Sequence, residues 1–275
     1  MVNQHPAGAV CPGLSVRGAV QTVRAALAAA DIPEIIRATR GLAGIHPVIG
    51  CEVYTTLGKL RDRPNGREHV GHLVLLAENN TGYANLMKIV SRGFTEGYYY
   101  KPRVDMEVLN QYHEGIIALS ACLAGEVQRY IIKGLLDEAR KVARKYEACF
   151  GKGNYFLELQ DHGMPEQKQV NTELLKMSRE LDIPLVATND VHYTYAKDAD
   201  SHDILLCLQT GKKLADEDRM RYEGGQYYVK SEEEMKGLFP YAWEAVENTQ
   251  RIADRCNVEI EFGVTKLPKY EVPEG

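Results

Sequence analysis

The sequence predicts an α/β fold of the (β/α)-barrel type, and three observations lead to that prediction. From about residue 44 onward, short apolar runs alternate with stretches that carry apolar residues at three- and four-residue spacing. Strands that alternate with helices are expected to pair in parallel through right-handed crossovers. Five such units fit into about 150 residues, which favours a barrel over a short open sheet.

The strands and helices are expected in a regular order. The apolar runs that predict strands lie at 47–54, 72–77, 115–120, 154–159 and 183–188. The helices between them are expected at 81–91, at 125–150 with a break near Gly134, and at 164–181, where Pro165 suits the first turn. Later segments predict a helix at 199–208, a charged loop at 210–225, a short strand at 226–230 and helices at 231–239 and 241–256.

The two ends of the chain differ from this repeat. Residues 1–42 contain an alanine-rich helical stretch at 16–30 and no strand pattern, so an atypical, helix-rich or aberrant segment is expected there. The barrel domain is expected at 43–263. Residues 264–275 have the extended, proline-containing composition of a linker.

Composition and charge exclude several classes of protein. Hydrophobic residues make up 44% of the 275 residues and charged residues 26%, as in ordinary globular domains. The sequence has neither an apolar run of membrane-spanning length nor a signal peptide, so a cytoplasmic protein without a membrane partner is expected. A net charge of −5 argues against electrostatic binding of DNA over the whole surface of the protein. The six cysteines lack C-x-x-C spacing, which argues against a zinc ribbon or a disulfide framework.

Candidate functional residues lie at strand ends, where parallel α/β folds place their sites. Glu52 is a carboxylate inside an apolar strand, which is costly unless it is paired or bound to a metal. His72 opens a strand and is either a ligand or a satisfied core group. Cys122 follows a strand and taken alone would be a packing residue.

Asp190 and His192 give the most specific local signal in the chain. Two residues apart on an extended segment, they would point the same way and offer a carboxylate and an imidazole to one metal ion. With Glu52, His72 and Cys122 they form a mixed donor set that suits zinc, manganese or iron-like ions. Two or three such ions activate water in phosphoester hydrolysis.

Two further segments have open interpretations. His162, after the strand at 154–159, either supports the metal ligands or faces the substrate, unless the segment serves only to start a helix. Residues 97–103 interleave aromatic and cationic side chains, and Tyr99, Lys101 and Arg103 could stack bases and hold phosphate. A loop that docks against a neighbouring domain explains the same residues slightly better.

These motifs resemble the PHP (polymerase and histidinol phosphatase) domain of bacterial replicative DNA polymerase III alpha subunits. The matching stretches are 44–54, 72–79, 97–105, 119–125 and 186–192, and 262–268 is similar to the lead into the polymerase region. The resemblance implies a distorted seven-stranded (β/α) barrel with a metal cluster at one mouth. Its ligands here would be Glu52, His72, Cys122, Asp190 and His192, with Asp190 and His192 serving catalysis. Members that keep the whole cluster support a 3′–5′ exonuclease, whereas in others the domain is mainly structural.

The start of the chain departs from the family pattern. The motifs H-x-H-x-H-T-x-Y-S and T-D-H-G are absent, and His5 stands alone. Four of the family's nine usual ligands, and the first two barrel strands, are therefore expected to be missing. The segment is either a true divergence or an artefact such as a shifted reading frame.

Two functions from different classes follow from the resemblance. The missing motifs favour a structural module that supports the polymerase core and has a vestigial or incomplete zinc or manganese site. The five remaining ligands favour an active metal-dependent 3′–5′ exonuclease, and a free-standing phosphoesterase fits less well. The implied partners are the polymerase domains of the same parent chain, DNA held by the parent, and the clamp and proofreading subunit of the replicase. Magnesium would be needed only in the polymerase domains. The chain as written is expected to lack the polymerase active site.

Overall fold

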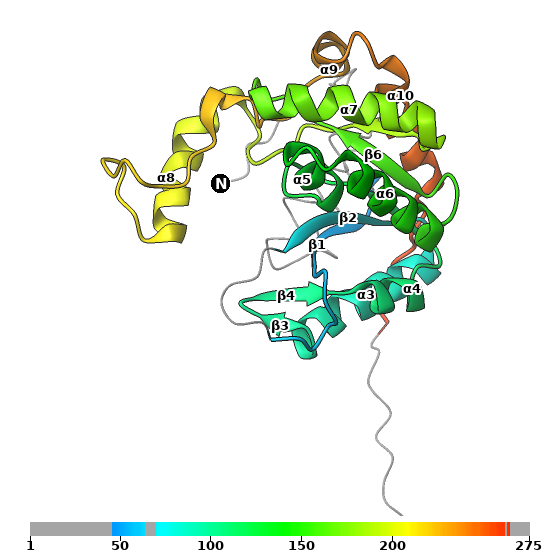
Figure 1. The fold of residues 1–275 in the computed structure, drawn as a ribbon. Helices are drawn as coiled ribbons and strands as arrows, with labels where there is room; N and C mark the ends of the chain where they lie inside the picture. Colours follow the sequence, from blue (N-terminus) through cyan, green and yellow to red (C-terminus); the bar gives the residue numbers. More distant parts are fainter. Residues whose placement is uncertain (1–45, 64–69, 262, 265–275) are drawn as a thin grey trace, which may run out of the picture.

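The computed structural model describes residues 46–63, 70–261 and 263–264, and these form a mixed α/β fold (Figure 1). The strands are β1 (Gly50–Thr55), β2 (Gly71–Ala77), β3 (Tyr98–Tyr99), β4 (Lys101–Val104), β5 (Ile116–Leu119), β6 (Tyr155–Leu159) and β7 (Leu185–Ala187). The α-helices are α3 (Asn80–Thr95), α4 (Met106–Gln111), α5 (Glu126–Ile132), α6 (Leu136–Phe150), α7 (Pro165–Leu181), α8 (Ala199–Thr210), α9 (Glu232–Leu238) and α10 (Trp243–Arg255). Short 3₁₀ turns lie at Ala196–Asp198 and Glu223–Gly225.

The strands of the described part form one sheet in the order β3-β4-β1-β2-β5-β6-β7. The expectation of parallel pairing throughout is wrong. β1–β4, β5–β6 and β6–β7 are parallel, but β1–β2, β2–β5 and β3–β4 are antiparallel. β2 runs opposite to both of its neighbours, because it pairs antiparallel with β1 and with β5. As a result, the carboxyl ends of β1, β5, β6 and β7 meet the start of β2 at one end of the sheet.

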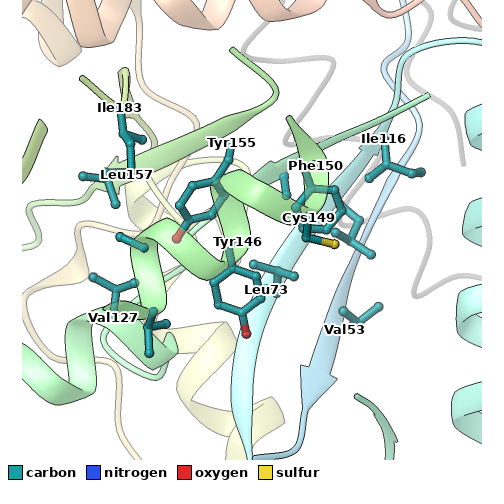
Figure 2. Packing of buried hydrophobic residues seen from close by; sticks show 14 of the residues in the cluster. Val53, Leu73, Ile116, Val127, Tyr146, Cys149, Phe150, Tyr155, Leu157 and Ile183 are labelled. Carbon is teal, nitrogen blue, oxygen red and sulfur yellow. The ribbon is translucent and has the colours of Figure 1, made fainter. Parts of the chain in front are cut away.

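Both faces of the sheet are buried, which explains the nearly continuous apolar runs of its strands. Alternate residues of β2 enter different clusters: Leu73 and Leu75 pack under the helices, and Val74 and Leu76 pack on the other face. On the first face, α6 places Tyr146, Cys149 and Phe150 over the strands (Figure 2). On the second face, α10 contributes Ile252, Ala253 and Cys256.

Local signals fix most helix boundaries where they were expected. Gly134, with φ of 73°, separates α5 from α6, and Pro165 opens α7. Ser231 caps α9 and shares a capping box with Glu234. The expected strand at 226–230 is wrong, because only a single bridge joins Tyr228 to Tyr193 and no ladder follows. The helix α4 and the hairpin β3–β4 were not predicted.

The prediction of a distorted seven-stranded barrel that lacks its first two strands depends on residues that are not described. The alanine-rich stretch 16–30 and the whole of 1–42 lie outside the described residues, as does most of the expected linker 264–275. Within the described part, β3 and β7 are the edges of the sheet. The mixed α/β class is confirmed, whereas the seven-stranded barrel and its missing strands stay predictions.

Two glycines allow a matched test of packing at the start of α3. A Cβ at Gly82 would lie 1.8 Å from the Gly115 carbonyl oxygen, whereas a Cβ at Gly237 in α9 would meet nothing within 4 Å. We expect Gly82→Ala to lower the free energy of unfolding by about 2–4 kcal/mol, since the backbone must move apart. Gly237→Ala should raise it by about 0.5–1 kcal/mol. Urea denaturation followed by circular dichroism measures both, and equal effects would contradict the close approach of α3 to Gly115.

Candidate functional site

Three of the five predicted ligands are in contact at the end of the sheet where β1 finishes and β2 starts. Glu52 Oε1 lies 3.1 Å from His72 Nδ1, and Cys122 Sγ lies 3.6 Å from the same nitrogen. Tyr54 of β1 pairs with His72 of β2, so Glu52 and His72 are diagonal neighbours on one face. The turn after β5 reaches them because the His72 amide donates to the Ala124 carbonyl.

Asp190 and His192 lie in the turn after β7. The backbone is not extended there as the sequence reasoning assumed, because Asp190 has a left-handed φ of 39°. His192 Nδ1 lies 2.6 Å from the Asp190 carbonyl oxygen, and the His192 amide donates to the Tyr227 carbonyl. The His192 ring packs at 4.4 Å from the ring of Tyr222. The alternation of an extended segment therefore does not place the two side chains on one side.

Electrostatics connect the two halves of the site. Burial raises the pKa of the Cys122 thiol to about 12, and the negative charges of Asp190 and Glu52 raise it further. Burial likewise raises the pKa of Tyr222 to about 12, with contributions from Asp190, Cys122 and Glu52. Glu52 and Asp190 therefore act on the same thiol and the same hydroxyl group, although they come from strands far apart in the sequence.

The donor types fit a metal better than their arrangement does. Carboxylate, imidazole and thiol are ligands that zinc accepts, and carboxylate with imidazole also suits manganese. A thiol must lose its proton to bind, and the raised pKa of Cys122 opposes that loss in the metal-free protein. Among residues 46–63, 70–261 and 263–264, no group of three or more His, Cys, Asp and Glu is arranged to hold a metal ion. The ligand roles stay predictions.

His162 is buried next to the turn that carries Asp190. The side chain is buried, and its ring stacks on Tyr227 at 3.9 Å. His162 Nδ1 lies 2.8 Å from Gln167 Nε2, and His162 Nε2 lies 2.9 Å from the Asn189 carbonyl oxygen. Because an amide nitrogen donates and a carbonyl accepts, Nδ1 is the acceptor and Nε2 carries the proton. Burial lowers the pKa of His162, as suits this neutral tautomer. The residue therefore supports the turn that carries Asp190.

The aromatic and cationic segment 97–103 forms the hairpin β3–β4. Arg103 cannot contact nucleic acid, because it is 0% exposed and donates to the carbonyls of Gly97 and Asp62. Tyr99 and Lys101 are half-buried, and Lys101 Nζ lies over the ring of Tyr54. The contact role of Tyr99 and Lys101 stays a prediction, and that of Arg103 is corrected.

Sequence reasoning missed Glu158, Asn189 and Tyr222. Glu158 lies in the apolar strand 155–159 and is 2% exposed, so the argument used for Glu52 would have found it. Asn189 donates to the carbonyls of Gln226 and Tyr228 and so holds the turn before Asp190. Tyr222 comes from the charged loop and carries no sequence signal that points to the site.

Lys230 supplies a pH-dependent prediction. Its side chain is buried, its Nζ donates to the Gln226 carbonyl, and Nζ lies 3.7 Å from the centre of the Tyr228 ring. Burial lowers the pKa of Lys230 to about 8. An unfolded lysine titrates near 10.4, so between about pH 8 and 10.4 the unfolded state binds more protons and stability rises with pH.

We therefore expect Lys230→Met to remove this rise. The stability difference, variant minus unmodified chain, should become more negative by about 2 kcal/mol between pH 7 and pH 10. This figure allows for the favourable contact of the Lys230 ammonium with the Tyr228 ring. Urea denaturation at four pH values measures the difference. The surface variant Lys176→Met should show no such trend. A difference between Lys230→Met and the unmodified chain that is constant with pH would contradict the prediction.

Within the described residues, no helix is both long enough and apolar enough to cross a membrane. The helix α8 projects away from the sheet (Figure 1) and exposes three apolar side chains, Ile204, Leu205 and Leu208.

Comparison with known proteins gives a family match and several related sequences. Residues 14–162 match the PHP domain family. The chain is 48% identical over 233 residues to DNA polymerase III subunit alpha of Treponema pallidum, and 46% identical over 242 residues to that of Deinococcus radiodurans. The protein of the same name from Thermus aquaticus is 40% identical over 241 residues. Each match covers 84% of this chain and 18–20% of the relative, so the chain spans about a fifth of their length. The family match begins inside the segment 1–42, which the sequence reasoning had set apart.

Proposed function

The chain belongs to the PHP domain family, and we propose that it is the PHP region of a replicative DNA polymerase III alpha subunit, where it supports the polymerase core. The observation that carries this proposal is the identity of 46–48% to alpha subunits over 84% of the chain. The proposed partners are the polymerase domains of the same polypeptide and, through them, DNA and the clamp and proofreading subunit of the replicase.

We further propose that the metal site is incomplete. Zinc or manganese would be held by Glu52, His72, Cys122, Asp190 and His192, and when bound would polarise water for attack on a phosphoester. The contacts of His72 with Glu52 and Cys122 support the choice of these residues. The absence from the sequence of the family's two opening histidine motifs supports incomplete occupancy.

The metal content of the purified chain tests this second part. Because several ligands are missing, we expect less than about one equivalent of zinc or manganese per chain by elemental analysis. His72→Ala should remove the metal that is present, whereas His113→Ala, at an exposed histidine after α4, should leave it unchanged. Two or more tightly held ions per chain would contradict the proposal and favour the exonuclease.

Support of the polymerase core is tested in the polypeptide that joins this region to polymerase domains. A substitution that destabilises this domain, such as Arg103→Met, should reduce primer extension in step with the loss of folded domain as urea is added. Arg61→Met, on a side chain that is 78% exposed, should leave extension unchanged. Full primer extension by a polypeptide whose PHP region is demonstrably unfolded would defeat the proposal.

The second candidate is an active 3′–5′ exonuclease. The observation that favours it is the proximity of Asp190 and Glu52 to one thiol, which concentrates negative charge as a cation site requires. The nuclease assay described in the Discussion separates the two candidates.

A further inference from the structure

Buried polar residues alternate along the chain at the end of β6: Glu158 lies in the strand, and Gln160 and His162 follow it. Alternate residues of an extended segment point to the same side, and Gln160 Nε2 donates to Glu158 Oε1, so these two form one polar row. The strand β6 lies between β5 and β7 in the sheet. The row therefore lies between the two turns that carry Cys122 and Asp190.

Glu158 holds the turn after β5. The Ala121 amide donates to Glu158 Oε2 at 2.9 Å, and the Glu158 amide donates to Ser120 Oγ at 2.8 Å. Ala121 has a φ of 64°, a left-handed conformation that an alanine avoids unless its surroundings impose it. Gln128 adds a bond from its amide to the Ala121 carbonyl. The direction in which Cys122 leaves this turn depends on these contacts.

The same carboxylate also reaches the turn after β7. Thr188 Oγ1 donates to Glu158 Oε1 at 2.5 Å, and Gln160 Nε2 donates to the same oxygen at 3.0 Å. Two residues beyond Thr188, Asp190 also has a left-handed φ. One buried carboxylate therefore joins two turns with unfavourable backbone conformations, and both turns carry candidate ligands.

We propose that Glu158 is a positioning residue that fixes Cys122 and Asp190 relative to each other. Its two oxygens accept on opposite sides, Oε2 from the β5 turn and Oε1 from the β7 turn. Its assignment to a metal site rests on the proposed function, but the positioning itself does not. A carboxylate that served stability alone would not need to bridge the two turns that bear the candidate ligands.

Three variants separate the reach of the side chain from its charge. Glu158→Gln keeps the length, and its amide oxygen can still accept from Ala121 while Thr188 and Gln160 reorient. Glu158→Asp keeps the charge but shortens the reach, and Glu158→Leu removes both acceptors. The metal-free chain is treated with iodoacetamide, and each cysteine is followed by peptide mass spectrometry. Cys149, which is buried in α6, and Cys256, which is buried at the end of α10, report any global loosening.

We expect alkylation of Cys122 to accelerate about tenfold or more in the Asp and Leu variants, because the turn opens more often once its hydrogen bond is lost. The Gln variant should stay within about threefold of the unmodified chain, since it keeps the acceptor. Alkylation of Cys149 and Cys256 should not change in any variant. If Glu158→Leu fails to fold, the Asp variant alone decides.

Zinc binding, measured by competition with a chromophoric chelator, gives a second readout. Loss of a group that orients a ligand typically weakens metal binding about 10- to 100-fold, and we expect this of the Asp and Leu variants. If the unmodified chain binds no zinc, the incomplete site holds none, and the alkylation rates alone decide the role of Glu158. Unchanged Cys122 alkylation in the Asp and Leu variants overturns the positioning role. The positioning role is also overturned if all three cysteines are alkylated faster by the same factor. It is overturned as well if alkylation of Cys122 accelerates equally in the Gln and Leu variants.

Discussion

Replacing Arg103 by methionine is expected to lower the free energy of unfolding by about 3 kcal/mol or more. The guanidinium of Arg103 is completely buried and joins the hairpin β3–β4 to the segment that follows β1. It donates through Nε to the Gly97 carbonyl and through Nη2 to the Asp62 carbonyl, and it lies over the Tyr99 ring. Methionine fills much of the volume but leaves the Gly97 and Asp62 carbonyls without these donors.

Two further variants show whether geometry or charge matters. Arg103→Lys keeps the charge, but a single ammonium group cannot donate in both directions as the planar guanidinium does, so most of the loss should remain. Arg61→Met, on the same segment, removes an exposed ion pair with Glu96 and should change stability by less than about 0.5 kcal/mol. Urea denaturation measures all three. A loss in Arg103→Met no larger than that in Arg61→Met would show that the buried donors do not stabilise the fold.

Nuclease activity is expected to be negligible in the chain as written. Two-metal cleavage needs one ion to generate hydroxide and a second to hold the leaving oxygen, and the family resemblance implies that four ligands are missing. An ion that is not held stabilises nothing in the transition state, so the rate should fall by orders of magnitude. We expect no 3′–5′ cleavage of a primer with a frayed end, even with added manganese.

A graft makes this expectation testable in both directions. Replacing residues 1–42 by an opening segment that carries both histidine motifs should restore manganese-dependent cleavage. Asp190→Asn should abolish the restored activity. Asp182→Asn is the matched control, because Asp182 is also an aspartate with a left-handed backbone but lies at the exposed end of α7. Robust cleavage by the chain without the graft, lost in Asp190→Asn, would mean that the five remaining ligands suffice.

The sequence alone determined most of the local structure and the family. Five apolar runs predicted β1, β2, β5, β6 and β7. Gly134, Pro165 and Ser231 predicted where helices start or stop. These signals are local, because a cap, a proline at a first turn or a left-handed glycine acts within a few residues of itself. The motif order likewise identified the PHP family, which the comparisons confirm.

Only the tertiary structure decided the strand directions and the roles of individual polar residues. Arg103 was expected to contact nucleic acid or a neighbouring domain, and Glu158 was overlooked, yet both are buried and join segments distant in sequence. The sequence of a segment indicates how polar each residue is. Whether a residue is exposed, however, depends on which other segments pack against it. The antiparallel pairing of β1 with β2 and of β2 with β5 follows the same rule, because a strand's apolar pattern is the same in either direction. The direction of each strand is set by its packing partners, which lie far along the chain and come together only in the folded state.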